Sequence, residues 1–301
     1  MRNIQNFLIF MFLIFGQVLP AQIIGITASQ LKTGTPLLGD DYPGMSVAYS
    51  LRKINSGYTG HCIQIKRTSD NATSNIDFDG EGVDEAAITS FCSGTTGYVI
   101  TWYDQSGNGY NLTTTATDYY IYQSGALITL NGKIAIANTA GTTPLASASV
   151  AGTIFYSGTT SISNTGLIVY SAIAGKFSIG ISHSGNAILQ YVGPTSTQSS
   201  YRVYNNSSLN YGTSLPSAGT QMIIQAEFNS GANTSDYWIN GSSVDTGDAA
   251  NTGTPGSGVI TVGQYGSNAF YLCDKLQEIV IWPSYVGDLP GIYSNASAFW
   301  N

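Results

Sequence analysis

Apolar and polar residues alternate along much of the chain, with the two-residue period of a half-buried β-strand. The segment HCIQIKRTS at 61–69 has this period, and GYVITWYD at 97–104 is a second strand candidate. Further strands are predicted at 126–137, 166–173, 176–182, 187–192, 220–228, 235–245, 258–265 and 275–283. Because Gly, Asn, Ser and Pro separate them, the pattern predicts an all-β fold, a two-sheet antiparallel jelly-roll sandwich with a few short helices.

Two short segments have helical spacing instead. VDEAAITSFC at 83–92 begins beside Asp84, a residue type that caps helix N-termini, and predicts one or two helical turns. MSVAYSLRKI at 45–54 places Val47, Leu51 and Ile54 on one side and also predicts a short helix.

The N-terminal segment MRNIQNFLIFMFLIFGQVLPAQ has one Arg, an apolar run and a small-residue cleavage pattern. It predicts a signal peptide at 1–21, with an uncleaved membrane anchor as the alternative. A lead-in segment at 22–45 and a single sandwich domain at 46–301 would follow. We therefore expect a secreted, cell-surface or virion-surface protein, in contact with a membrane only if the first segment is retained.

The charge content of the chain limits the classes of binding partner that we expect. Only 9% of the 301 residues are charged, against about 25% in ordinary soluble domains, and the net charge is −7. Ten Lys and Arg residues spread along the chain do not form the basic face that nucleic acid requires. We expect a glycan or polysaccharide partner, and a homo-oligomer or assembly partner is left open.

Three cysteines, Cys62, Cys92 and Cys273, remain after the predicted cleavage. Export to an oxidising compartment makes one disulfide plausible, and Cys62–Cys92 is the predicted pair because the two flank one short region. The alternative is that all three are small buried apolar residues.

Two segments carry a family resemblance: AYSLRKINSGYTGHCIQIKRTSDNATSNIDF at 48–78 and FCSGTTGYVITWYDQSGNGYNLT at 91–113. They resemble the catalytic domain of α-L-arabinofuranosidase B, which implies a concanavalin A-like jelly roll. The matching positions are Ala48, Ser50, Arg52, Tyr58, Gly60, Arg67, Ser69, Asp70, Phe91, Cys92 and Tyr103 through Gly109. The same signature and the C-terminal segment also resemble laminin-G-like and lectin-like sandwiches, whose closing strand precedes a short helix.

The resemblance implies two catalytic carboxylates, since glycoside hydrolysis normally uses a pair across the scissile bond. The family's acid/base stretch corresponds to VGQYGSNAFYL at 262–272, which has no carboxylate. The region of the family's nucleophile corresponds to roughly 183–215, which contains no Asp or Glu. We therefore predict no catalytic residues and expect the protein not to be an enzyme. The alternative catalytic residues are Glu278, which shares a sheet face with apolar residues, and Asp274.

The segment from Trp102 to Gly109 is interpreted as a structural corner. Asp104 and Gln105 can bond backbone N–H groups, while Gly107 and Gly109 permit a positive φ. Trp102 is expected to pack between sheets, and sugar stacking by Trp102 or Tyr103 is the alternative.

Tyrosine-rich stretches supply the predicted glycan-binding residues, because aromatic faces stack on sugar C–H groups. These residues are Tyr119, Tyr120, Tyr204, Asn205 and Tyr265. No cofactor is predicted, with calcium as the alternative, because hard oxygen ligands surround Gly80 in NIDFDGEGVDEA. These ligands are Asp77, Asp79, Glu81 and Asp84.

The main functional hypothesis is an exported, non-catalytic lectin-like protein that binds glycans or mediates adhesion at a cell or virion surface. One alternative is a structural subunit of a phage spike, phage decoration or extracellular filament. The other is a glycoside hydrolase of the α-L-arabinofuranosidase type.

Overall fold

The computed structural model describes residues 36–138, 145–150, 163–171, 180–183, 186–192, 199–203, 207–211, 219–229, 232, 234–248, 258–262 and 275–301. Residues from Pro36 to Asn301 form one compact unit, which therefore begins before the expected domain start at residue 46. Leu38 is fully buried within it, and the Gly39 N–H donates to the Ile54 carbonyl at 2.5 Å. The predicted signal peptide lies outside the described residues.

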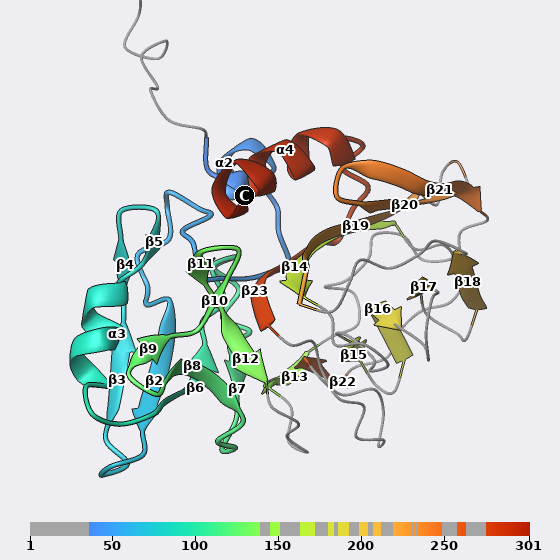
Figure 1. Cartoon of the computed structure of the whole chain (residues 1–301). Helices are drawn as coiled ribbons and strands as arrows, with labels where there is room; N and C mark the ends of the chain where they lie inside the picture. Colours follow the sequence, from blue (N-terminus) through green and yellow to red (C-terminus); the bar gives the residue numbers. More distant parts are fainter. Residues whose placement is uncertain are drawn as a thin grey trace, which may run out of the picture. The chain divides into compact units, whose positions relative to one another are not determined.

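The unit is mostly antiparallel β-structure with few helices, as the alternation of apolar and polar residues predicted (Figure 1). The strands before residue 140 are β1 (Val47–Ser50), β2 (Ile63–Arg67), β3 (Thr73–Ile76), β4 (Phe78–Asp79), β5 (Gly82–Val83), β6 (Gly97–Trp102), β7 (Leu112–Thr113), β8 (Tyr119–Gln123), β9 (Ala126–Leu127), β10 (Thr129–Leu130), β11 (Lys133–Ile134) and β12 (Ile136–Asn138). The later strands are β13 (Leu145–Val150), β14 (Asn164–Ser171), β15 (Gly180–His183), β16 (Asn186–Val192), β17 (Ser199–Val203), β18 (Ser207–Tyr211), β19 (Gln221–Asn229), β20 (Thr234–Ile239), β21 (Ser242–Asp248), β22 (Gly258–Val262) and β23 (Lys275–Trp282).

Strand β23 is the centre of the hydrogen-bonded network. It pairs with β14 along one edge, and with β1 and β12 along the other. From β14 the ladder continues through β19 and β20 to β21, and from β12 it continues through β8 and β6 to β2 and β3. Because seven of its eight residues are buried, β23 fills the core instead of alternating between core and solvent.

The helix predicted at 45–54 is wrong, because Val47–Ser50 forms strand β1. Its residues pair with β23 in a register that sets Val47 opposite Ile281 and Ser50 opposite Glu278. All four β1 residues are buried, so a helix-like spacing of apolar residues arose in a strand that is covered on both faces. The segment's partner is more than 220 residues away in sequence, and local spacing cannot reveal it.

The segment predicted as one strand at 235–245 is a hairpin of β20 and β21. Its turn is Asn240-Gly241, with φ of 49° and 75°. Two consecutive positive φ values match the type I′ turn, which fits the twist of paired strands and favours Asn-Gly. The turn residues therefore divide the apolar segment into two strands.

The helices are α2 (Leu38–Asp41), α3 (Glu85–Phe91) and α4 (Leu289–Trp300). The predicted helix at 83–92 is confirmed as α3, with the Asp84 carboxylate accepting from the Ala87 N–H at 2.8 Å. The short helix expected near the chain end is α4, capped by Asp288 and lying beside α2 (Figure 1). Within the described residues, none of the helices combines the length and apolar character needed to cross a membrane.

Candidate functional site

The loop after β6 is a buried polar corner. The Asp104 carboxylate is 2% exposed and accepts from the N–H groups of Ala48, Ser106 and Tyr110 at 2.9–3.1 Å. Positive φ angles of 88° at Gly107 and 77° at Gly109 let the chain reverse around it.

Gln105 extends the same corner toward the N-terminal segment. Its side-chain carbonyl accepts from the Ile54 N–H at 3.0 Å, and its amide donates to the carbonyls of Ser50 and Arg52, both at 2.9 Å. Trp102 is fully buried, with its ring centroid 6.1 Å from that of Tyr49. These contacts give the corner a structural role, fixing the path of residues 46–54.

The predicted glycan-binding tyrosines do not form one described surface. The prediction for Tyr119 is wrong, because the residue is only 2% exposed and its hydroxyl accepts from the Leu145 N–H at 3.0 Å. Such a ring offers no face to a sugar. Tyr120 is half-buried and lies 4.7 Å from the Tyr98 ring, measured between centroids. Tyr204, Asn205 and Tyr265 lie outside the described residues.

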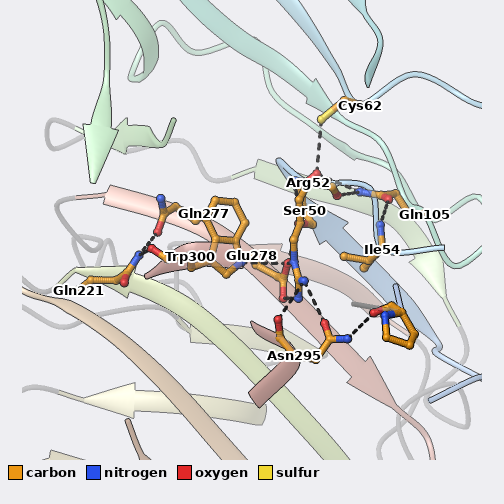
Figure 2. Close-up of polar contacts among 11 residues, drawn as sticks. Ser50, Arg52, Ile54, Cys62, Gln105, Gln221, Gln277, Glu278, Asn295 and Trp300 are labelled. Atoms are coloured by element: carbon orange, nitrogen blue, oxygen red, sulfur yellow. Dashed lines mark hydrogen bonds and ion pairs between the residues drawn. The ribbon is translucent and has the colours of Figure 1, made fainter. Parts of the chain in front are cut away.

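Glu278 is held in a buried ion pair, which argues against its role as an alternative catalytic residue. Its two carboxylate oxygens accept from Arg52 Nε at 2.7 Å and Arg52 Nη2 at 3.0 Å (Figure 2). Ser50 Oγ and Trp300 Nε1 also donate to it, at 2.7 and 3.2 Å. The side chain is fully buried, so this carboxylate cannot reach a glycosidic bond. Asp274, the other alternative, lies outside the described residues.

A second buried carboxylate, Glu227, is also committed to the fold. It accepts from Thr165 Oγ1 at 2.7 Å and from the N–H groups of Val286 and Gly287 at 2.8 and 2.6 Å. Burial raises the pKa of this carboxyl group, and the three hydrogen bonds oppose that rise. Glu227 thus fixes the turn before α4.

Three exposed carboxylates, Asp79, Glu81 and Glu85, line a pocket of about 560 Å³. Its walls come from the β4–β5 hairpin, the start of α3, the β10–β11 hairpin and the end of α4. The lining residues are Leu51, Asp79, Glu81, Gly82, Val83, Glu85, Ala86, Lys133, Ile134, Phe299 and Trp300. A pocket of this volume is within the usual range for small-molecule sites.

The pocket has an acidic rim and an apolar interior. Asp79, Glu81 and Glu85 are exposed carboxylates on the rim, whereas Val83 and Trp300 are buried. Lys133 places its ammonium group 4.8 Å from the centre of the Phe299 ring. Carboxylates accept hydrogen bonds from sugar hydroxyls, and apolar or aromatic surfaces contact sugar C–H groups.

The sequence pointed to Asp79 and Glu81, but only as ligands in the calcium alternative. Four other pocket residues were not predicted: Glu85, Lys133, Phe299 and Trp300. Across the described ranges, no three His, Cys, Asp or Glu side chains converge closely enough to hold a metal ion. Of the other two residues in that calcium set, Asp84 caps α3 and Asp77 pairs with His61. The signal that could have found the pocket was the acidic turn at 75–86 together with an aromatic chain end.

The predicted disulfide is wrong, because Cys62 and Cys92 are both free thiols. Cys62 Sγ donates to the Ser50 carbonyl at 3.4 Å, and burial raises its pKa well above the usual range. Cys92 lies at the end of α3 and is buried against Gly97. Each thiol therefore packs as a small apolar residue in its own part of the core. Cys273 lies outside the described residues.

Comparison with known proteins shows that part of this chain is similar to α-L-arabinofuranosidases. Residues 40–164 match the family model described as the catalytic domain of α-L-arabinofuranosidase B. A probable α-L-arabinofuranosidase B of Aspergillus terreus is 38% identical over 104 residues, which cover 30% of this chain and 21% of the relative. An α-L-arabinofuranosidase of Hypocrea jecorina is 37% identical over 103 residues, with the same coverage. The match thus spans about a fifth of the length of these relatives.

Solved structures extend the similarity beyond the matched segment. A mutant GH54 α-L-arabinofuranosidase soaked with 4-nitrophenyl α-L-arabinofuranoside gives a TM-score of 0.64 at 20% identity. An arabinofuranosidase complexed with arabinofuranosyl-α-1,2-xylobiose gives 0.62 at 20% identity. Each alignment covers 87% of this chain and 64% of the other. The chain therefore shares the fold of these enzymes over most of its length, beyond the segment that matches in sequence.

These findings correct the main functional hypothesis of a non-catalytic lectin-like protein. The matching family and the structures with the same fold are arabinofuranosidases, and none of these comparisons supports the adhesion, phage or filament readings. The hypothesis rested on missing carboxylates in two stretches of sequence. It did not include Asp79, Glu81 and Glu85, which lie outside those two stretches and line a pocket.

Proposed function

We propose that the protein is a glycoside hydrolase of the α-L-arabinofuranosidase type, acting on a glycan that carries arabinofuranosyl groups. The observation that carries this proposal is the match of residues 40–164 to the catalytic-domain family. The shared fold with two arabinofuranosidase structures supports it further. Because the relatives are much longer than the matched segment, the activity of this chain requires its own test.

The pocket is the proposed active site. Hydrolysis uses one carboxylic acid to protonate the leaving oxygen and one carboxylate as nucleophile or base. The family's own carboxylate positions correspond to stretches without acids here, so we assign the pair to the pocket rim, among Asp79, Glu81 and Glu85. The three are exposed and come from two neighbouring elements, whereas Glu227 and Glu278 are buried in structural contacts.

The test is release of 4-nitrophenol from 4-nitrophenyl α-L-arabinofuranoside by the purified full chain. We expect turnover by the wild-type protein and a loss of about 10²–10⁴-fold in kcat on Glu81→Gln or Glu85→Gln if that residue is the acid or base. Asp79→Asn completes the scan, and Asp41→Asn, an exposed acid in α2, is the matched control. Absence of turnover on a panel of aryl glycosides would overturn the proposed activity. Turnover that survives all three pocket substitutions would overturn the pocket assignment alone.

Two finer points belong with this proposal. We expect the described antiparallel ladders to form the two-sheet jelly roll that the sequence predicted, and the fold similarity supports this arrangement. We also expect export through the predicted signal peptide, because the N-terminal segment has an apolar run followed by a small-residue cleavage pattern. Recovery of the protein from the culture medium, with an N-terminus after residue 21, would test the second point.

A further inference from the structure

One wall of the pocket is built from the last two residues of α4, and a buried ion pair stands directly behind it. Phe299 and Trp300 line the pocket, while Arg52 and Glu278 do not. Trp300 Nε1 donates to Glu278 Oε2 at 3.2 Å, and the Arg52 guanidinium carbon lies 5.5 Å from the Phe299 ring centre. Both aromatic residues are therefore attached to the same ion pair.

Arg52 also fixes the body of α4. Its Nη1 donates to Asn295 Oδ1 at 2.9 Å and to the Asn295 carbonyl at 3.3 Å (Figure 2). Asn295 Nδ2 in turn donates to the Pro36 carbonyl at 2.6 Å. The guanidinium thus uses its planar set of donors to hold the helix and Glu278 in one geometry, which a lysine cannot reproduce.

The neighbouring residue on β23, Gln277, holds the part of the wall that comes from the β10–β11 hairpin. Its Nε2 donates to the carbonyls of Leu130 and Ile134, both at 3.1 Å, which ties the β10–β11 hairpin to β23. Its Oε1 accepts from Gln221 Nε2 at 2.6 Å, and Gln221 Nε2 also approaches the Trp300 carbonyl at 3.3 Å (Figure 2). Two consecutive residues of one strand therefore fix the hairpin with Lys133 and the helix end with Phe299.

We propose that Arg52 and Glu278 are positioning residues for substrate binding, an inference that rests on the proposed function. They hold Phe299 and Trp300 at a fixed separation from the acidic rim, so that a sugar unit meets its aromatic contact without reordering the wall. A wall fixed before binding lowers the ordering cost and so raises affinity. The two side chains do not line the pocket, so they act on binding through the aromatic residues. The Arg52 backbone bridges Gly82 in the β4–β5 hairpin, and a side-chain substitution leaves that bridge and the rim acids in place.

The decisive variant is Arg52→Lys, which keeps the positive charge beside Glu278 but loses the planar set of donors. We expect KM for the aryl arabinofuranoside to rise about tenfold, with kcat within about twofold of wild type, because ground-state and transition-state binding weaken together. The matched control is Arg67→Lys. Arg67 makes a two-pronged contact with Asp70 at 2.8 and 2.7 Å and lies 4.8 Å from the Phe91 ring centre, but it does not line the pocket.

An unchanged KM in folded Arg52→Lys, or a fall in kcat without a rise in KM, would overturn the inference. If Arg52→Lys does not fold, Ser50→Ala takes its place, since it removes the hydroxyl that donates to Glu278 and that accepts from the Arg52 backbone N–H at 3.0 Å. We expect it to raise KM about threefold, and an unchanged KM in that variant overturns the inference as well.

A binding measurement separates this inference from the proposed activity. Arabinose-containing oligosaccharide is titrated into ¹⁵N-labelled protein, and the Trp300 indole N–H signal is followed. If the wild-type protein binds the sugar without cleaving it, and Arg52→Lys binds it more weakly, the proposed hydrolase activity is overturned and the positioning role is kept. Wild-type protein that neither cleaves nor binds the sugar would overturn both.

Discussion

The Asp104 carboxylate accepts a hydrogen bond of 2.9 Å from the backbone N–H of Ala48. The two residues belong to different strand regions, since Ala48 lies in β1 and Asp104 follows β6. The contact joins the corner loop to the strand that pairs with the centre of the fold. Together with Gln105, it makes a polar turn into a fixed junction between segments.

Asp104→Ala should therefore lower the free energy of unfolding by about 3 kcal/mol. The substitution leaves three backbone N–H donors without their acceptor, and an unsatisfied buried donor costs about 1–3 kcal/mol. Urea denaturation followed by circular dichroism measures the change. Asp41→Ala, at an exposed position, is expected to change the value by less than about 0.5 kcal/mol. Equal stabilities of the two variants would contradict the role of the corner.

Glu278→Gln is expected to be destabilising by about 3–5 kcal/mol, because it leaves the buried Arg52 guanidinium without its counter-charge. The shape of the side chain is almost unchanged, so the loss reports the charge. Asp70→Asn is the comparison, since it breaks a similar pair with Arg67 at the surface, where solvent screens the charges. Thermal unfolding should show a large decrease in Tm for Glu278→Gln and a much smaller decrease in Tm for Asp70→Asn.

Gly97→Ala should lower stability by about 1–3 kcal/mol, because the added methyl group would overlap the sulfur of Cys92. Cys92→Ala removes that sulfur and should relieve part of the cost. The double variant is thus expected to be more stable than the sum of the two single effects predicts, by at least about 0.5 kcal/mol. Simple additivity in a double-mutant cycle by urea denaturation would contradict this packing.

Cys62 and Cys92 should both be alkylated by iodoacetamide when the protein is unfolded without reductant. In the folded protein, burial raises the pKa of the Cys62 thiol, so little thiolate forms and labelling at that position should be slow. Mass spectrometry of the digested protein measures the label at each site. A cross-linked peptide containing both residues would instead restore the disulfide that the sequence suggested.

Much of the β-structure was predictable because burial left a local pattern. The predicted segments at 220–228 and 275–283 became Gln221–Asn229 and Lys275–Trp282, within one residue at each end. The Asp84 cap similarly placed the start of α3. The strand at Val47–Ser50 was missed, because its identity depends on a pairing with β23 that no local spacing encodes.

The candidate site was less predictable, because it is assembled from distant segments. Asp79 and Glu81 drew attention as a cluster of acids, but the sequence does not say that Lys133 and Phe299 complete the same pocket. Glu278 was predicted to share a face with apolar residues. Its pairing with Arg52 required knowledge of the β1–β23 register, which places Ser50 opposite Glu278.

The central place of β23 also governs when the chain can fold. Strands β1, β12 and β14 all pair with residues 275–282, which follow each of them at a long distance in the sequence. Pairings between residues so far apart in sequence form slowly, because a long loop must close first. The three strands therefore stay without their shared partner in the nascent polypeptide until residues 275–282 have been synthesised.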